Sequence, residues 1–111
     1  MRLQDRPYRM IESGRKTVEI RLWDEKRRLL SVGDEIEFQN ASDPGLSLLC
    51  RVLALHRFDS FCGLYASLDL LQCGYTEQTV ASASPRDMAQ YYSEKEERKY
   101  GVVGIELRLC R

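Results

Sequence analysis

The sequence has no long apolar run and no excess of charge of either sign. Its 111 residues include 17 Lys or Arg and 17 Asp or Glu. The apolar stretches fall far short of the roughly 20 residues that a membrane-spanning helix needs, and charged residues stand where a signal peptide has its apolar region. Balanced charge also argues against the strong binding of duplex nucleic acid that basic proteins achieve by counterion release. We therefore expect a cytoplasmic protein with one domain over residues 1–111 and no membrane partner.

Metal-binding and redox motifs are also absent. The four cysteines are 12, 11 and 37 residues apart, with no C-x-x-C pair, and the only histidine is His56. A zinc site needs closely spaced cysteine or histidine ligands, and disulfides are rare in cytoplasmic proteins. His56 lies in an apolar run, which favours a structural role over a catalytic one. We predict no metal site and no cofactor, and we expect free thiols at Cys50, Cys62, Cys73 and Cys110.

Residues 14–21 are the most informative segment, with the sequence Gly-Arg-Lys-Thr-Val-Glu-Ile-Arg. If residues 17–23 form a strand, side chains alternate between its two faces, and Glu19 and Arg21 share one of them. Lys16 precedes the strand at the glycine turn. The other face carries apolar residues that we expect to face the core: Val18, Ile20 and Leu22. The pattern leaves two interpretations open, a polar binding site or a solvated edge strand with an Arg–Glu pair.

These residues also carry a resemblance. Gly14, Lys16, Glu19 and Arg21 match G-x-K-x-x-E-x-R, and with them the chain resembles the ASCH domain family. The Val-Gly-Asp turn at 32–34 and the closing segment at 100–105 look like the compact single-domain prokaryotic members, so the resemblance covers essentially the whole chain. It implies an α+β fold, a small mixed β-barrel of the PUA-like type with flanking helices.

The resemblance implies RNA or a nucleoside- or nucleotide-like ligand as the partner. Residues 1–28 carry nine Lys or Arg against five Asp or Glu, and a local cationic patch suits such a ligand better than a long duplex. Arg21 would hold a phosphate or a base acceptor, and Glu19 would orient Arg21 or accept from a base amino group. Lys16 would supply positive charge at the mouth of the binding pocket. Arg15 is expected at the rim. Tyr91 and Tyr92 are candidates for stacking on a base, although core packing is the more common fate of such side chains.

Two alternatives stay open. One branch of the family comprises amidohydrolases of acetylated cytidine nucleosides, in which a lysine after the glycine turn activates a threonine three residues later. Lys16 matches the lysine, but the threonine position holds Glu19, so that mechanism does not transfer directly. Hydrolysis of a modified nucleoside or of short RNA, as in ribonuclease-like relatives, remains possible with Lys16 or Glu19 as the base. The second alternative is a regulatory protein-interaction domain.

Further glutamates could take part in such chemistry. A separate proton-donating glutamate belongs to the amidohydrolase mechanism, and Glu77 is a candidate for it. Glu19 together with Glu77 or Glu106 could also hold magnesium weakly. Metal dependence and oligomeric state stay open.

The remaining patterns predict elements by their periodicity and end signals. A helix is expected over residues 3–13 with Gly14 at its C-terminal end, and a short helical turn capped by Asp24. The longest helix should begin at Ser84-Pro85, with its last part, residues 93–99, as a solvated charged tail. A short helix is expected over residues 60–66, and strands over residues 35–39, 46–58 and 102–109. The last strand should close the barrel beside the motif strand, with one face formed by Val103, Ile105, Leu107 and Leu109.

Overall fold

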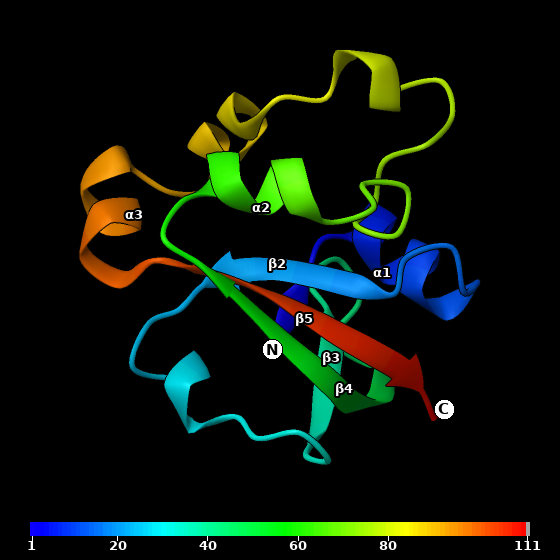
Figure 1. The fold of residues 1–111 in the computed structure, drawn as a ribbon. Helices are drawn as coiled ribbons and strands as arrows, with labels where there is room; N and C mark the ends of the chain where they lie inside the picture. Colours follow the sequence, from blue (N-terminus) through cyan, green and yellow to red (C-terminus); the bar gives the residue numbers. More distant parts are fainter. Residues whose placement is uncertain (111) are drawn as a thin grey trace.

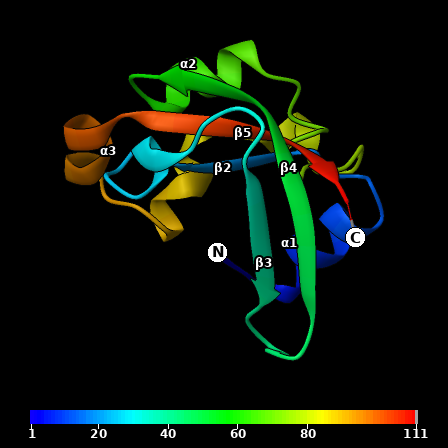
Figure 2. The ribbon, with the colours of Figure 1, turned by 90° about the horizontal axis from the view of Figure 1, so that it is seen from below.

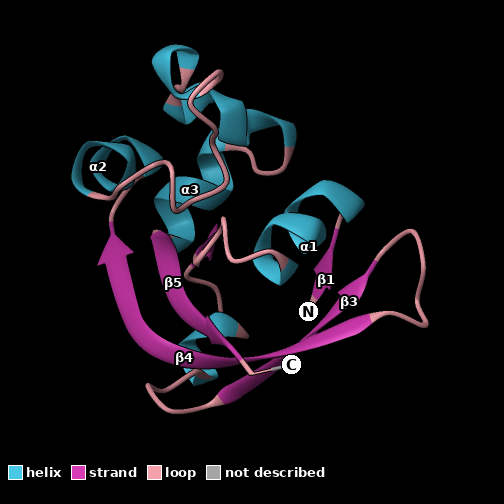
Figure 3. Cartoon of the chain, turned by 90° about the vertical axis from the view of Figure 1, so that its right-hand side faces the viewer, coloured by secondary structure: helices cyan, strands magenta, loops and turns pink. Residues whose placement is uncertain are grey.

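Five strands form one mixed sheet that curls into a half-barrel with helices on its flanks (Figures 1 and 3). This computed structural model describes residues 1–110. The strands are β1 (Arg2–Leu3), β2 (Val18–Leu22), β3 (Glu35–Asn40), β4 (Ser47–Phe58) and β5 (Val102–Leu109). The α-helices are α1 (Asp5–Glu12), α2 (Phe61–Ser67) and α3 (Glu94–Tyr100), and short 3-10 helices are η1 (Arg27–Leu29), η2 (Val80–Ser82) and η3 (Pro85–Gln90). The predicted α+β class and PUA-like architecture are confirmed, with the barrel open on one side.

The strand order is β1-β3-β4-β5-β2. Only the β1–β3 pair is parallel, and the other neighbours are antiparallel. Figure 2 shows β4 as the long central strand between β3 and β5. The predicted pairing of the last strand with the motif strand is confirmed, but the prediction that the last strand closes the barrel is wrong, because β1 and β2 do not pair. Because β1 and β2 lie at opposite ends of this order, they are the two edges of the half-barrel.

Two apolar clusters hold the helices against the two faces of the sheet. In the first, α1 lies within the curve of the sheet (Figure 3) and buries Tyr8 and Ile11 against β3, β4 and β5. In the second, α2 covers the opposite face through Phe61 and Leu64. The predicted core triplet of β2, namely Val18, Ile20 and Leu22, belongs to this second cluster. The part of the sheet formed by β2 and β5 is therefore covered on both faces, whereas β3 is buried on one face and exposes Glu35, Glu37 and Gln39 on the other.

A glycine on β5 allows α2 to approach closely. At Gly104, a Cβ atom would lie 2.6 Å from Leu68 Cδ1 and 3.2 Å from Val18 Cγ1. Both distances are too short for ordinary contact, so a side chain here would force the side chains of Val18 and of Leu68, the residue that follows α2, to shift. The alternation predicted for β5 is confirmed for Val103, Ile105 and Leu107, while Leu109 at the strand's end is 38% exposed.

Two helix predictions need correction. The first helix begins at Asp5 rather than Leu3, because Arg2 and Leu3 pair with β3 as a strand. The predicted long helix from Pro85 is wrong. It is instead the six-residue 3-10 helix η3, which ends before Tyr91, and a separate helix, α3, follows.

Residues 93–99, which were predicted to be the charged tail of that helix, begin a helix of their own. Ser93 accepts a hydrogen bond from the Glu96 N–H, and the Glu96 side chain accepts from the Ser93 N–H. This reciprocal capping box begins a new helix. Among residues 1–110, no helix is long and apolar enough to cross a membrane.

Candidate functional site

The glycine turn and β2 place the motif side chains at the open side of the half-barrel. Gly14 adopts a φ of 81°, and the Lys16 N–H donates to the Met10 carbonyl at 3.0 Å, which joins the end of α1 to the motif. On β2, Glu19 is paired with Ile105 and Arg21 with Val103. Paired residues of antiparallel strands share a face, so both charged side chains point to the α1 side of the sheet.

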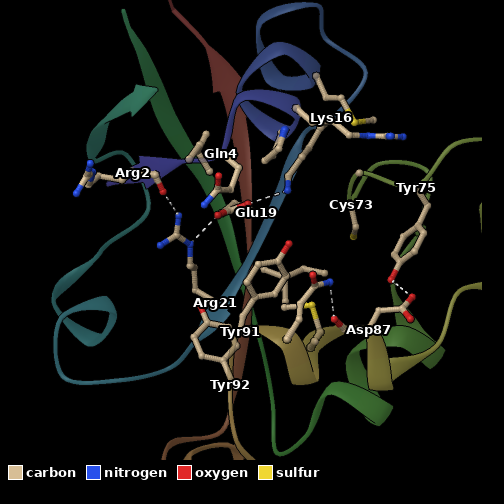
Figure 4. Close-up of a pocket in the computed structure, with 18 of the residues that line it drawn as sticks. Arg2, Gln4, Lys16, Glu19, Arg21, Cys73, Tyr75, Asp87, Tyr91 and Tyr92 are labelled. Carbon is tan, nitrogen blue, oxygen red and sulfur yellow. Dashed lines mark hydrogen bonds and ion pairs between the residues drawn. The ribbon is translucent and has the colours of Figure 1, made fainter. Parts of the chain in front are cut away.

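A buried carboxylate organises this group. Glu19 Oε1 lies 2.8 Å from Lys16 Nζ, and Glu19 Oε2 accepts a hydrogen bond of 2.6 Å from Arg21 Nε. Figure 4 shows Glu19 between the two cations. The exposed fraction is 5% for Glu19 and 8% for Lys16. The interpretation of this strand as a solvated edge with a surface ion pair is therefore wrong.

The two cations decide the protonation of Glu19. Burial alone would raise the pKa of Glu19, but the charges of Lys16 and Arg21 and their hydrogen bonds outweigh burial and hold the pKa below its ordinary value of 4.5. The carboxylate is therefore ionised at neutral pH. Each of its oxygens already faces a cation, so Glu19 fixes the positions of Lys16 and Arg21.

Arg21 also reaches across the opening between the two edge strands. Its Nη2 donates a 2.8 Å hydrogen bond to the backbone carbonyl of Arg2 in β1 (Figure 4). The guanidinium is thus held by an acceptor on each side of the opening. It has further N–H donors, as does the Lys16 ammonium. These donors are available to a ligand.

The group forms one wall of a cavity of about 660 Å³. The cavity lies between α1, the β1 and β2 edges, and the segment from α2 to η3. Gly74, with a φ of +111°, lies directly against the Lys16 side chain, since a Cβ atom at Gly74 would lie 3.4 Å from Lys16 Cδ. Arg2 and Arg6 are exposed residues that add positive charge to the lining.

The opposite wall carries a hydrogen-bonded acid that is not among the predicted site residues. The Tyr75 hydroxyl donates to Asp87 Oδ2 at 2.7 Å, and the Ser84 N–H donates to the same oxygen at 3.1 Å. The Tyr65 hydroxyl lies 2.7 Å from that of Tyr75. Burial and the hydrogen bonds to Tyr65 and Asp87 raise the pKa of Tyr75 well above its ordinary value. Asp87 Oδ1 has no hydrogen-bond partner among residues 1–110 and is available as an acceptor.

Both candidate tyrosines line the cavity. Tyr92 is half-buried and stacks on Phe61, with ring centroids 5.9 Å apart and an interplanar angle of 17°. Tyr91 is 58% exposed. Figure 4 shows both rings on the Arg21 side of the cavity. Tyr91 is therefore the ring with a free face, whereas Tyr92 supports it from the core.

A family model described as the ASCH domain matches residues 1–111. The chain belongs to the ASCH domain family. Two solved structures are similar over almost their whole length. The crystal structure of hypothetical protein PH0355 is 32% identical, with a TM-score of 0.78, and the match covers 98% of this chain and 95% of that one. The solution NMR structure of protein PF0455 from Pyrococcus furiosus is 31% identical, with a TM-score of 0.75 and coverage of 100% and 96%. A search of curated proteins found no match to the chain.

Three other predicted residues of this ASCH domain are not part of the cavity lining. Arg15 is exposed and is not part of the lining, so its place at the rim stays a prediction. Glu77 is exposed, and Glu106 Oε1 lies 2.9 Å from His56 Nε2 on the sheet. Neither glutamate lines the cavity with Glu19. Within residues 1–110, no group of three or more His, Cys, Asp or Glu side chains is placed to hold a metal ion.

Proposed function

We propose that this cavity binds RNA or a nucleotide-like ligand. The observation that carries the proposal is the Lys16–Glu19–Arg21 group, in which a buried carboxylate holds two cations with N–H donors left for a ligand. Such preorganised donors suit phosphate oxygens and base carbonyl groups, because charge-assisted hydrogen bonds are strong and the side chains need no further ordering.

The other walls support the same class of ligand. Tyr91 offers a face on which a base can stack, and base–aromatic stacking contributes about 1–3 kcal/mol per base. Asp87 on the opposite wall offers an acceptor for a base amino group. The cavity thus combines donors, an aromatic face and an acceptor, which are the groups that proteins use to hold unpaired nucleotides.

The hydrolase alternative gains less support from the geometry. Glu19 has a lowered pKa, which makes it a weak base, and both of its oxygens are engaged. Cys73 lines the cavity, but burial raises the pKa of its thiol to about 11. A thiol with that pKa is protonated at neutral pH and is a poor nucleophile. Lys16 remains the candidate base, and hydrolysis stays a prediction.

The test is equilibrium binding of short single-stranded RNAs and mononucleotides, measured by calorimetry. Tyr91→Ala removes an exposed ring, so it should leave the fold intact and weaken binding about tenfold. Arg21→Ala should abolish measurable binding. The matched control is Arg51→Ala, which removes an arginine paired with Glu35 outside the cavity. Circular dichroism and melting curves verify that each variant is folded.

Two results separate the alternatives. Unchanged affinity in folded Arg21→Ala and Tyr91→Ala would contradict the proposed site. Chromatography of the same incubations detects any product, with and without magnesium. A product that Lys16→Ala no longer forms would establish the hydrolase instead.

A further inference from the structure

A second concave site lies at the other end of β2, where the chain leaves the sheet. It has a volume of about 460 Å³ and shares no lining residue with the first cavity. Three segments meet there: the turn after β2 with η1, the end of β4, and the end of α3, which Figure 1 shows on the side of the molecule away from α1. A hydrogen bond of 3.0 Å from the Trp23 N–H to the Gly101 carbonyl joins the first and last of them. We call this site the Trp23 cleft. Its lining is Trp23, Arg28, Arg57, Phe58, Asp59, Arg98, Lys99, Tyr100 and Gly101.

The cleft concentrates positive charge that the protein does not neutralise. Four of its side chains are cationic, Arg28, Arg57, Arg98 and Lys99, and Asp59 is the single acidic one. Within residues 1–110, none of the four cations forms a salt bridge with a carboxylate. Elsewhere on the chain, arginines do have such partners, for example in the Arg51–Glu35 pair at 3.3 Å. Bringing like charges together costs free energy, which an anion in the cleft would offset.

Neutral groups hold the first of these cations in position. Arg28 Nε donates to the Trp23 carbonyl at 2.8 Å, and its Nη2 donates to the Tyr100 carbonyl at 3.2 Å. Carbonyl acceptors order a guanidinium without cancelling its charge, in contrast to a carboxylate. Arg28 therefore keeps its full charge and has N–H donors left, in a fixed orientation.

Aromatic rings order two further cations. The guanidinium carbon of Arg57 lies 5.4 Å from the centre of the Trp23 ring, and Lys99 Nζ lies 5.1 Å from the centre of the Tyr100 ring. Both arrangements are cation–π contacts, which position a cation without neutralising it. Cations that are held in place but not neutralised therefore surround the cleft on three sides. This arrangement is expected of a phosphate site, because an arginine guanidinium donates two parallel hydrogen bonds to two phosphate oxygens.

We propose that the Trp23 cleft binds a phosphate group, independently of the ligand in the first cavity. Arg28 and Arg57 hold the phosphate oxygens, while Arg98 and Lys99 add charge from the end of α3. The phosphate comes either from a small phosphate compound or from the backbone of a single strand. In the second case, Trp23 or Tyr100 also offers an aromatic surface for an adjoining base.

The chain supplies its own reporter, because Trp23 is its only tryptophan. Fluorescence of the whole protein is titrated with pyrophosphate in one arm and with a short single-stranded oligonucleotide in the other. Sodium chloride at equal ionic strength corrects for salt. The expected result is a saturable change in Trp23 emission in at least one arm. Saturation by pyrophosphate identifies a small-compound site, and saturation by the oligonucleotide alone identifies the backbone as the source.

Variants tie the signal to the cleft. Arg57→Gln removes an exposed cation with little risk to folding, and Arg28→Gln removes the fixed one. Each should raise the apparent Kd at least tenfold. The matched control Arg51→Gln loses the same charge from a paired site outside the cleft and should bind like the unmodified protein.

The outcomes are separable from those of the first proposal. The absence of a saturable change in both arms, or equal loss of affinity in Arg57→Gln and Arg51→Gln, would overturn the phosphate site. Arg21→Ala, which alters only the first cavity, should keep the Trp23 response to pyrophosphate. Failure of the first cavity to bind therefore leaves this proposal standing, and the reverse also holds.

Discussion

Replacing Glu19 by glutamine tests the central feature of the motif, which is a buried carboxylate that holds two cations. The substitution keeps the shape of the side chain and removes its charge. Lys16 and Arg21 are then left without their anion in a mostly buried position, where Glu19 itself is only 5% exposed. An uncompensated buried charge is strongly destabilising, in contrast to the loss of a whole ion pair.

The expected size of the effect follows from this burial. Removing one partner of a buried pair costs about 3–5 kcal/mol, and the lower end applies here because Lys16 and Arg21 border a cavity that water can enter. A loss of about 3 kcal/mol is a large share of the roughly 5–15 kcal/mol of a typical domain. At roughly 4 °C per kcal/mol for a domain of this size, the melting temperature should fall by about 12 °C.

The pH dependence gives the effect a signature. The folded-state pKa of Glu19 lies below the ordinary value of 4.5. Its charge therefore stabilises the fold fully above the unfolded-state pKa, and this contribution is lost as the pH falls through the folded-state pKa. The difference in unfolding free energy between the unmodified protein and Glu19→Gln should be constant near neutral pH and should shrink well below pH 4.5.

Urea unfolding at neutral and acidic pH measures both quantities. The matched control is Glu35→Gln, whose exposed pair with Arg51 should contribute at most about 1 kcal/mol. Two results would refute the reasoning. One is a Glu19→Gln protein as stable as the control variant at neutral pH, and the other is a stability difference that persists unchanged in acid.

Two further predictions concern packing and the thiols. Gly104→Ala should destabilise the protein by about 1–3 kcal/mol in urea unfolding, because the new methyl group overlaps the Leu68 side chain; unchanged stability would show that Leu68 adopts another position without cost. In the native protein, a thiol reagent at neutral pH should label the two exposed cysteines quickly and spare Cys50 and Cys73, since burial raises the pKa of each of these thiols to about 11. Mass spectrometry counts the labels, and equal labelling of all four sites would contradict the burial.

The sequence predicted best the elements whose apolar residues recur at a regular spacing and whose ends carry turn or capping residues. Alternation in residues 17–23 placed Val18 and Ile20 in the core and Glu19 on the opposite face. The long run at 46–58 is the central strand β4. Both patterns are local, and burial of one face fixes them.

The prediction of one long helix from Pro85 was wrong for a physical reason. Pro85 and Asp87 are good helix-start residues, but the capping aspartate also bonds Tyr75, and the chain turns at Tyr91 before Ser93 begins a new helix. The Ser93–Glu96 capping box was a readable sign of that second start.

The candidate site was predictable only in part. The motif placed Lys16, Glu19 and Arg21 together, because they are neighbours on one strand and its turn. Contacts such as Tyr75 with Asp87, or Arg57 with Trp23, join segments distant in the chain, and nothing local in the sequence signals them. Arg28 in particular is indistinguishable in sequence from ordinary surface charge.

The hydrogen bond from Arg21 to the Arg2 carbonyl has a consequence for how this architecture can change. A single side chain spans the seam where backbone pairing would otherwise complete a barrel. The width and charge of the opening therefore depend on position 21 rather than on the strand order. Substitutions there can remodel the binding site while the sheet stays the same, so the ligand preference of the scaffold can vary without a change of fold.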